Sequence, residues 1–145
     1  TIFHNSSRVL EGVYAPGLQF TADGTAFLAR GGQIENDIYL IDDETGQVQQ
    51  TFQGHQATAS DQKWLAGESR LVSVGDTNGR AWGTGTLRVW DSVVGQEMVR
   101  LESGGARAVA VSADGRTIAV TTADGPVRIY DSRRFMNIAG ADSAN

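Results

Sequence analysis

An internal repeat is the feature that most constrains what this chain can fold into. A strand-like segment such as LRVWD occurs three times and closes at Asp42, Asp91 and Asp131. These aspartates are separated by 49 and then 40 residues. Four-stranded β units that stack on one another repeat at about 40–45 residues. The spacing therefore predicts about three such units in tandem, with an insertion in the longer interval.

Turn sequences divide each unit into short strands. Segments 18–24 and 109–115 both end in Asp-Gly, which adopts tight-turn geometry at low cost. Segments 117–122 and 71–74 are almost entirely apolar or β-branched, as expected for inner strands that are covered on both faces. Segment 48–52 alternates apolar and polar residues, like a half-exposed outer strand. In the last unit we expect strands at residues 106–112, 117–122, 127–131 and 135–138.

The composition agrees with a single all-β globular domain. The chain has 145 residues, of which 40% are hydrophobic and 20% charged, and it carries 18 Gly but only 2 Pro. Abundant Gly favours a chain with many tight turns. No window of about 11 residues has the 3.6-residue period of an amphipathic helix. We therefore expect strands and turns throughout.

Charge and cysteine content narrow the possible functions. The 12 basic and 17 acidic residues leave a net charge of −5, whereas a general nucleic-acid or anionic-membrane binder needs a basic face. Cysteine is absent, which excludes disulfides and thiolate metal sites and fits a reducing compartment, so we expect a cytoplasmic protein. The sequence has no run of 18 apolar residues, and its start does not resemble a secretion signal.

Paired motifs connect the repeat to a known family. Gly54-His55 is followed 35 residues later by Trp90-Asp91, and the two motifs resemble the Gly-His and Trp-Asp that bracket one repeat in the WD-repeat family of β-propellers. Two further segments resemble the same repeat, with Tyr or Ile in place of the Trp: residues 108–134 and residues 18–55.

The resemblance implies an all-β propeller of the WD-repeat type, with about three four-stranded antiparallel blades that form part of a larger ring. The implied boundaries are the end of a preceding blade at 1–12, blades at 13–54, 55–104 and 105–139, and a disordered tail at 140–145. Propellers close with typically 4–8 blades, so three blades leave two faces uncovered. The rest of the ring would come from a longer chain, from self-association or from another subunit. A fragment is favoured because both ends of the sequence fall inside a blade.

The resemblance also implies a structural role for several polar side chains. In WD repeats a His, a Ser or Thr, an Asp and the Trp form a buried hydrogen-bond chain, which is stabilising when every member is satisfied. The implied members are His55, Ser73, Asp76 and Trp90, with a reduced version at Thr121 and Asp124. His, Ser and Asp would also permit a catalytic triad, but no nucleophile turn or oxyanion loop accompanies Ser73. We therefore expect no catalytic residue.

No cofactor or metal site is predicted. Residues 76–79, DTNG, share alternating oxygen ligands and a Gly with part of a calcium loop, but the Gly comes too early and no closing Glu follows. The two histidines, His4 and His55, lie far apart in the sequence and do not make a transition-metal site on their own.

The segment 75–85, GDTNGRAWGTG, is the candidate partner-binding loop because it is longer than a plain hairpin. It carries Asn78, Arg80 and Trp82, and Trp and Arg are enriched at binding hot spots. The alternative is that Trp82 packs back on its own blade. A similar extension at residues 30–37 would lie beside this loop. We expect a non-catalytic scaffold that presents a rigid propeller face to a protein or peptide partner.

The alternative function is a propeller enzyme, or a cofactor- or ligand-binding domain, with chemistry in the central channel. First strands would line that channel near Gln19, Thr21, Ala108, Ala110 and residues 60–62. Asp61 is the one acidic residue in that set, and no His accompanies it. The scaffold is therefore the preferred function, although a fold by itself does not determine one.

Overall fold

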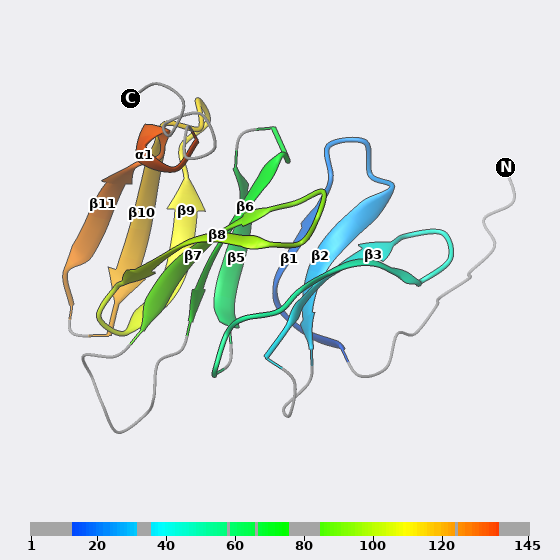
Figure 1. Cartoon of the computed structure of the whole chain (residues 1–145), viewed down its shortest axis with the longest axis horizontal. Helices are drawn as coiled ribbons and strands as arrows, with labels where there is room; N and C mark the ends of the chain where they lie inside the picture. The colour runs from blue at the N-terminus through cyan, green and yellow to red at the C-terminus, as the bar shows by residue number, and fades with distance from the viewer. Residues whose placement is uncertain are drawn as a thin grey trace, which may run out of the picture.

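The described part of the chain is built almost entirely from antiparallel β-sheets (Figure 1). The computed structural model describes residues 13–31, 36–57, 59–65, 67–75, 85–123 and 125–136. Within these residues the chain forms three sheets of four, four and three strands. This confirms the all-β class and the number of repeated units predicted from the sequence.

Consecutive strands are neighbours in every sheet, so each sheet is a simple meander. The first sheet contains β1 (Val13–Phe20), β2 (Ala26–Gly31), β3 (Ile38–Asp42) and β4 (Val48–Phe52). The second contains β5 (Ala59–Leu65), β6 (Arg70–Gly75), β7 (Thr86–Asp91) and β8 (Glu97–Glu102). The third contains β9 (Ala106–Val111), β10 (Thr117–Thr122) and β11 (Val127–Asp131).

The strand pairing is equivalent in the three sheets. Each strand-ending aspartate lies opposite the first residue of the second strand in its own sheet: Asp42 opposite Ala26, Asp91 opposite Arg70 and Asp131 opposite Thr117. Positions in different sheets can therefore be matched by counting from this pair. The match shows that the sequence repeat is also a repeat of backbone register.

A left-handed backbone closes the turn between the first and second strands of each sheet. Gly24 and Gly115 adopt φ angles of 73° and 72° at equivalent positions. In the second sheet the matching residue is Glu68, with a φ of 75°. Glycine tolerates this region at no steric cost, whereas a residue with a Cβ does not. The side chain of Glu68 accepts a hydrogen bond from the Ala22 amide in the turn between β1 and β2, so this position also carries a contact between sheets.

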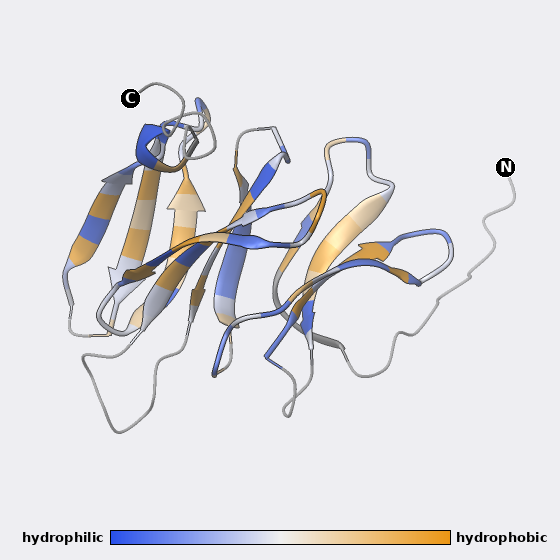
Figure 2. Cartoon of the chain, in the orientation of Figure 1, coloured by the Kyte–Doolittle hydropathy of each residue, from blue (hydrophilic) through white to orange (hydrophobic). Residues whose placement is uncertain are grey.

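The sheets pack face to face, with β1, β5 and β9 adjacent in that order (Figure 1). Leu28, Ile38 and Phe52 of the first sheet pack against the second sheet. A second cluster between the second and third sheets includes Val72, Val89 and Ile118, among others. Hydrophobic residues make up most of β2 and β9, each of which also contains one arginine, whereas they alternate with polar residues in β11 (Figure 2). The core therefore consists of two layers, one between each pair of neighbouring sheets.

The strand predicted at residues 135–138 is wrong for its described part, because the chain forms the short helix α1 (Arg133–Met136) there. The Asp131 carboxylate accepts a hydrogen bond from the Arg133 amide at 2.9 Å, and the Phe135 amide donates to the Ser132 carbonyl at 2.8 Å. These contacts tighten the chain into a helical turn and leave Phe135 buried in the core. Nowhere in the described residues is a helix long and apolar enough to cross a membrane.

Candidate functional site

A chain of buried polar side chains lies between the first and second sheets. The His55 Nε2 and Ser73 Oγ atoms are 2.6 Å apart, and the Trp90 indole N–H donates to the same Oγ at 2.8 Å. Ser73 and Trp90 are fully buried, and His55 nearly so. Three of the residues that the sequence grouped into one network are thus in direct contact.

The bonding of Ser73 limits what its hydroxyl can do. The indole N–H of Trp90 can only donate, so the Ser73 Oγ accepts from it. Because a hydroxyl can both donate and accept, the same Oγ also satisfies the contact with His55 Nε2. A serine nucleophile needs an accessible Oγ within reach of a substrate carbon. The Ser73 Oγ is enclosed and held from two sides, so its bonds are of the kind that stabilise a core.

The Gly-His and Trp-Asp motifs meet in space around Trp90. A Cβ on Gly54 would lie 2.9 Å from the Trp90 Cη2 atom and 3.0 Å from the Arg88 Nη1 atom. The rings of Phe52 and Trp90 meet edge to face, with centroids 5.9 Å apart. A glycine is therefore needed beside the indole. The two motifs are far apart in the sequence but meet here, because they belong to sheets that face each other.

The third sheet does not repeat the network in the predicted way. Register matching puts Val120 at the position of Ser73, so Thr121 points to the opposite face. Thr121 is exposed, and its Oγ1 accepts a hydrogen bond from the Ala108 amide at 3.1 Å. The prediction of a reduced network through Thr121 is corrected accordingly, because neighbouring strand residues face opposite sides of a sheet.

Sequence reasoning missed the polar contact that the third sheet does have. Ser103 is fully buried, and its Oγ lies 3.5 Å from the hydroxyl of Tyr130, which occupies the position of Trp90. The matching of Tyr130 to Trp90 was the available signal. Five other predicted residues lie outside the described residues: Asp76, Asn78, Arg80, Trp82 and Asp124.

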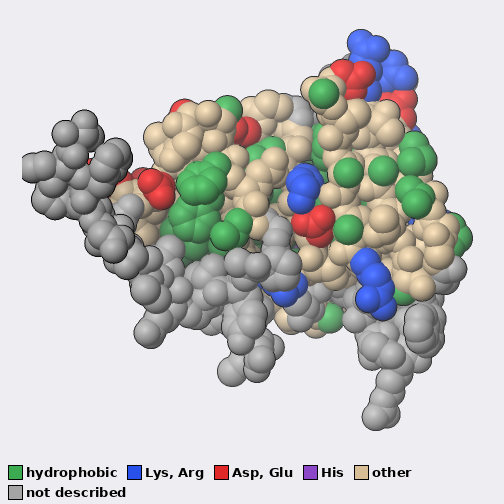
Figure 3. Space-filling model, turned by 180° about the vertical axis from the view of Figure 1, so that it is seen from behind, with side chains coloured by type: hydrophobic (Ala, Val, Ile, Leu, Met, Phe, Trp, Pro, Cys, Tyr) green, Lys and Arg blue, Asp and Glu red, His purple; other side chains and the backbone are tan. Residues whose placement is uncertain are grey.

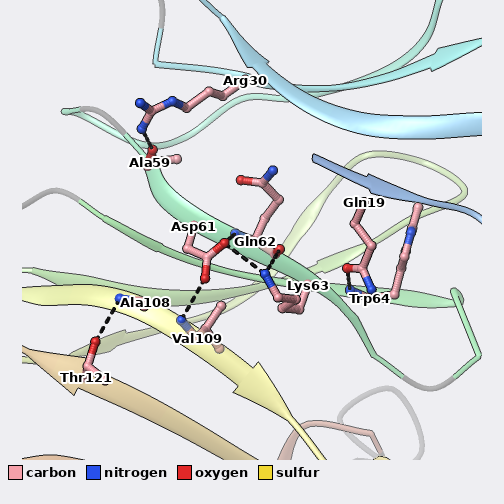
Figure 4. A network of polar contacts seen from close by, with 10 residues as sticks. All are labelled: Gln19, Arg30, Ala59, Asp61, Gln62, Lys63, Trp64, Ala108, Val109 and Thr121. Atoms are coloured by element: carbon pink, nitrogen blue, oxygen red, sulfur yellow. Dashed lines mark hydrogen bonds and ion pairs between the residues drawn. The ribbon is translucent and has the colours of Figure 1, made fainter. Parts of the chain in front are cut away.

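Polar side chains on the strands near the sheet interfaces connect one sheet to the next (Figure 4). The Gln19 Oε1 accepts a hydrogen bond from the Trp64 amide at 3.0 Å, and the Arg30 Nη1 donates to the Ala59 carbonyl at 2.5 Å. Both contacts join the first sheet to the second. Gln19 lies on β1, a first strand predicted to line a central channel, whereas Arg30 lies on β2. Both bonds are structural ones between neighbouring sheets.

Asp61 makes the corresponding connection between the second and third sheets. Its Oδ2 accepts from the Val109 amide at 3.0 Å, while its Oδ1 accepts from the Gln62 amide at 2.9 Å and from the Lys63 Nζ at 3.0 Å (Figure 4). A carboxylate that holds a strand of the next sheet and an ammonium group is engaged on both oxygens. In the described part of the chain, no group of three His, Asp or Glu side chains is placed to hold a metal ion.

The strand-ending aspartates organise the turn that follows each of them. Asp42 accepts from the Thr45 amide at 2.8 Å, and Asp91 accepts from the Val93 amide at 2.9 Å. The pKa of Asp42 is lowered, chiefly by the Thr45 amide hydrogen bond. The Arg133 side chain, which bonds both carboxylate oxygens of Asp131, lowers the pKa of Asp131 to about 2. The repeated Asp is therefore a turn-capping residue.

The residue after that Asp adds a second turn contact in two of the sheets. The Ser92 hydroxyl donates to the Glu68 carbonyl, and the Ser132 hydroxyl donates to the Gly115 carbonyl. Each bond ties the turn after the third strand to the turn between the first and second strands. The repeated Asp-Ser pair in the sequence was the signal for this contact.

Comparison with known proteins gives information on the fold but not on the family. No protein-family model matches the sequence, and no curated protein matches it. Among the solved structures with a similar fold is the crystal structure of the computationally designed Ika4 protein, with a TM-score of 0.60 and 20% sequence identity. The match covers 79% of this chain and 63% of that chain, so this chain spans less than two thirds of the designed protein. At this identity the similarity shows the fold alone.

Proposed function

We propose that the three sheets are consecutive blades of a β-propeller of the WD-repeat type, and that the chain is a non-catalytic scaffold for a protein or peptide partner. The equivalent register of the strand-ending aspartates supports the first part. So does the adjacent order of β1, β5 and β9, which is the arrangement of first strands around a propeller axis.

The bonding of Ser73 is the observation that carries the non-catalytic part of the proposal. Its Oγ is fully buried and is shared between His55 and Trp90, which are the residues that a WD repeat uses to stabilise its blade. Hydrolase activity that disappears in a Ser73→Ala variant with an unchanged fold would contradict the proposal.

The alternative of chemistry in a central channel has less support. The candidate acid on the first strands is Asp61, and both of its oxygens are bonded to Val109, Gln62 or Lys63. A general acid or base must be free to exchange a proton with a substrate. The contacts of Asp61 instead favour a role in holding two blades together.

The proposed partner surface is the rim where the second strands end. β6 ends at Gly75 and β7 begins at Thr86, and the connection between them contains Asn78, Arg80 and Trp82. β2 is the equivalent strand of the first sheet, so the β2–β3 connection leaves from the same rim. The net charge of −5 favours a protein or peptide over a nucleic acid or an anionic membrane.

Peptides selected from a displayed random library against the whole chain provide the test. We expect Arg80→Ala with Trp82→Ala to weaken the selected peptides at least tenfold and to leave the melting temperature unchanged. Arg100→Ala is the control, because Arg100 is exposed on the outer strand β8. A lower melting temperature with intact binding would show that the loop packs on its own blade.

A further inference from the structure

The outer face of the third sheet repeats a surface that is buried elsewhere in the molecule. Leu87 and Val89 of the second sheet are fully buried against the third sheet. Val127 and Ile129 occupy the equivalent positions of the third sheet and are 57% and 64% exposed. This face therefore has the position and the character of a packing surface, with no sheet of the described residues lying on it.

The outer face of the first sheet is the complementary surface. Phe20 lies opposite Phe27, as Trp64 lies opposite Leu71 in the second sheet, so Phe20 holds the position of Trp64. Trp64 packs against the core between the first and second sheets. Leu18 and Phe20 are instead 52% and 55% exposed. The outer face of the first sheet is thus equivalent to the face with which each sheet packs on the preceding one. It is the type of surface that would cover the outer face of the third sheet.

The two ends of the stack carry opposite charge. The described residues of the first sheet and its turns carry one basic side chain, Arg30, against five acidic ones: Asp23, Asp37, Asp42, Asp43 and Glu44. The described residues of the third sheet and α1 carry two acidic side chains, Asp114 and Asp131, against five basic ones: Arg107, Arg116, Arg128, Arg133 and Arg134. Figure 3 shows hydrophobic side chains at both ends of the molecule and basic ones at the α1 corner.

We propose that the outer face of the third sheet docks onto the outer face of the first sheet in a second copy of this chain. Matching apolar positions would bring the sheets together, and the opposite charges favour this end-to-end pairing over the pairing of two like ends. Head-to-tail contacts form a closed particle only when the rotation closes. Closure rests on the proposed propeller, in which two copies would supply six blades, within the usual range of four to eight.

The mass of the whole chain in solution, measured by light scattering over a concentration series, is the first test. We expect a particle of twice the 15.4 kDa chain mass. Ile129→Lys should raise its dissociation constant at least tenfold. Val93→Lys is the matched control, because Val93 is 78% exposed but lies in the β7–β8 turn, away from both outer faces. Circular dichroism reports whether each variant keeps the fold.

Mixing two defective variants tests the head-to-tail geometry. Ile129→Lys spoils the third-sheet face and Leu18→Glu spoils the first-sheet face, so neither variant pairs with itself. An equimolar mixture keeps one intact interface, between the first sheet of the Ile129→Lys variant and the third sheet of the Leu18→Glu variant. We expect the mixture to recover a two-copy particle. Self-pairing of the Leu18→Glu variant would show that like ends pair and would overturn the inference.

The remaining outcomes also decide the question. A mass of one chain at every concentration, or growth beyond two copies, overturns the pairing. Equal loss of pairing in the Ile129→Lys and Val93→Lys variants does the same. A two-copy particle whose selected peptides bind equally well without Arg80 and Trp82 would contradict the proposed partner surface and leave the pairing intact.

Discussion

At the scale of single residues, Ser73 connects two side chains that come from opposite sides of a sheet interface. Ser73→Ala removes the acceptor of the buried Trp90 N–H while leaving the shape of the core almost unchanged. A buried donor without its partner costs about 1–3 kcal/mol. We expect the free energy of unfolding, measured by urea denaturation, to fall by about 2 kcal/mol.

Thr121→Ala is the control for that measurement. Thr121 is exposed and accepts one hydrogen bond at the sheet surface, so its loss should lower stability by less than about 0.5 kcal/mol. If the two substitutions lowered the free energy of unfolding equally, the buried hydrogen bonds of Ser73 would contribute no more to stability than an exposed one.

Asp131 is the residue whose contacts predict a pH dependence. Its pKa in the folded chain is about 2, chiefly because of the Arg133 side chain, whereas an Asp in an unfolded chain titrates near about 3.9. The lowered pKa means that the ionised form stabilises the fold above pH of about 4, and that this contribution is lost as the pH falls toward about 2. Asp131→Asn removes the titrating group. We expect the urea midpoint of the variant to lie below the parent value at pH 6 and to approach it at about pH 2.

A constant difference between the two urea midpoints across this range would contradict the assignment. The Asp131–Arg133 pair is exposed, so raising the salt concentration should reduce the difference at pH 6.

At the scale of secondary-structure elements, the chain relies on close approach between the end of β4 and the end of β7. Gly54→Ala would put a Cβ 2.9 Å from the fully buried ring of Trp90, so the ring or the backbone must shift. Overpacking of this kind costs about 1–3 kcal/mol. We expect a lower unfolding free energy together with a shift in the tryptophan emission, because the indole must be displaced.

Gly115→Ala separates this effect from backbone strain. A Cβ on Gly115 meets no atom within 4 Å, but the residue has a φ of 72°. Its replacement should cost about 1 kcal/mol through the left-handed backbone alone. The tryptophan emission should not change. A shift in emission for this variant would mean that the turn is coupled to the Trp90 core.

At the scale of the whole molecule, cooperative unfolding of the three sheets depends on the contacts between them. Asp61 joins the second sheet to the third by accepting from the Val109 amide of β9. We expect Asp61→Ala to lower the unfolding free energy by about 2 kcal/mol and to speed hydrogen exchange at Val109. Glu102→Ala, on the exposed edge of β8, is the control. Unchanged exchange at Val109 would contradict the coupling.

Much of the local structure could be predicted from the sequence because the forces that produce it act over a few residues. The β4 strand was predicted at 48–52 from its alternation of apolar and polar residues, and β10 at 117–122 from its β-branched composition. The turns that end at Gly24 and Gly115 followed from their Asp-Gly sequences. Even His55, Ser73 and Trp90 could be grouped, although only through a resemblance to a family.

What the sequence by itself determined is therefore the class of fold, the number of sheets and the position of most strands. The tertiary structure decided which face each side chain occupies, because a shift of one residue reverses the face, as Val120 and Thr121 demonstrate. It also decided that residues 133–136 form a helix, since the burial of Phe135 depends on a core contributed by two sheets. The contacts of Gln19, Arg30 and Asp61 likewise join residues 29 to 48 positions apart, and no local pattern specifies them.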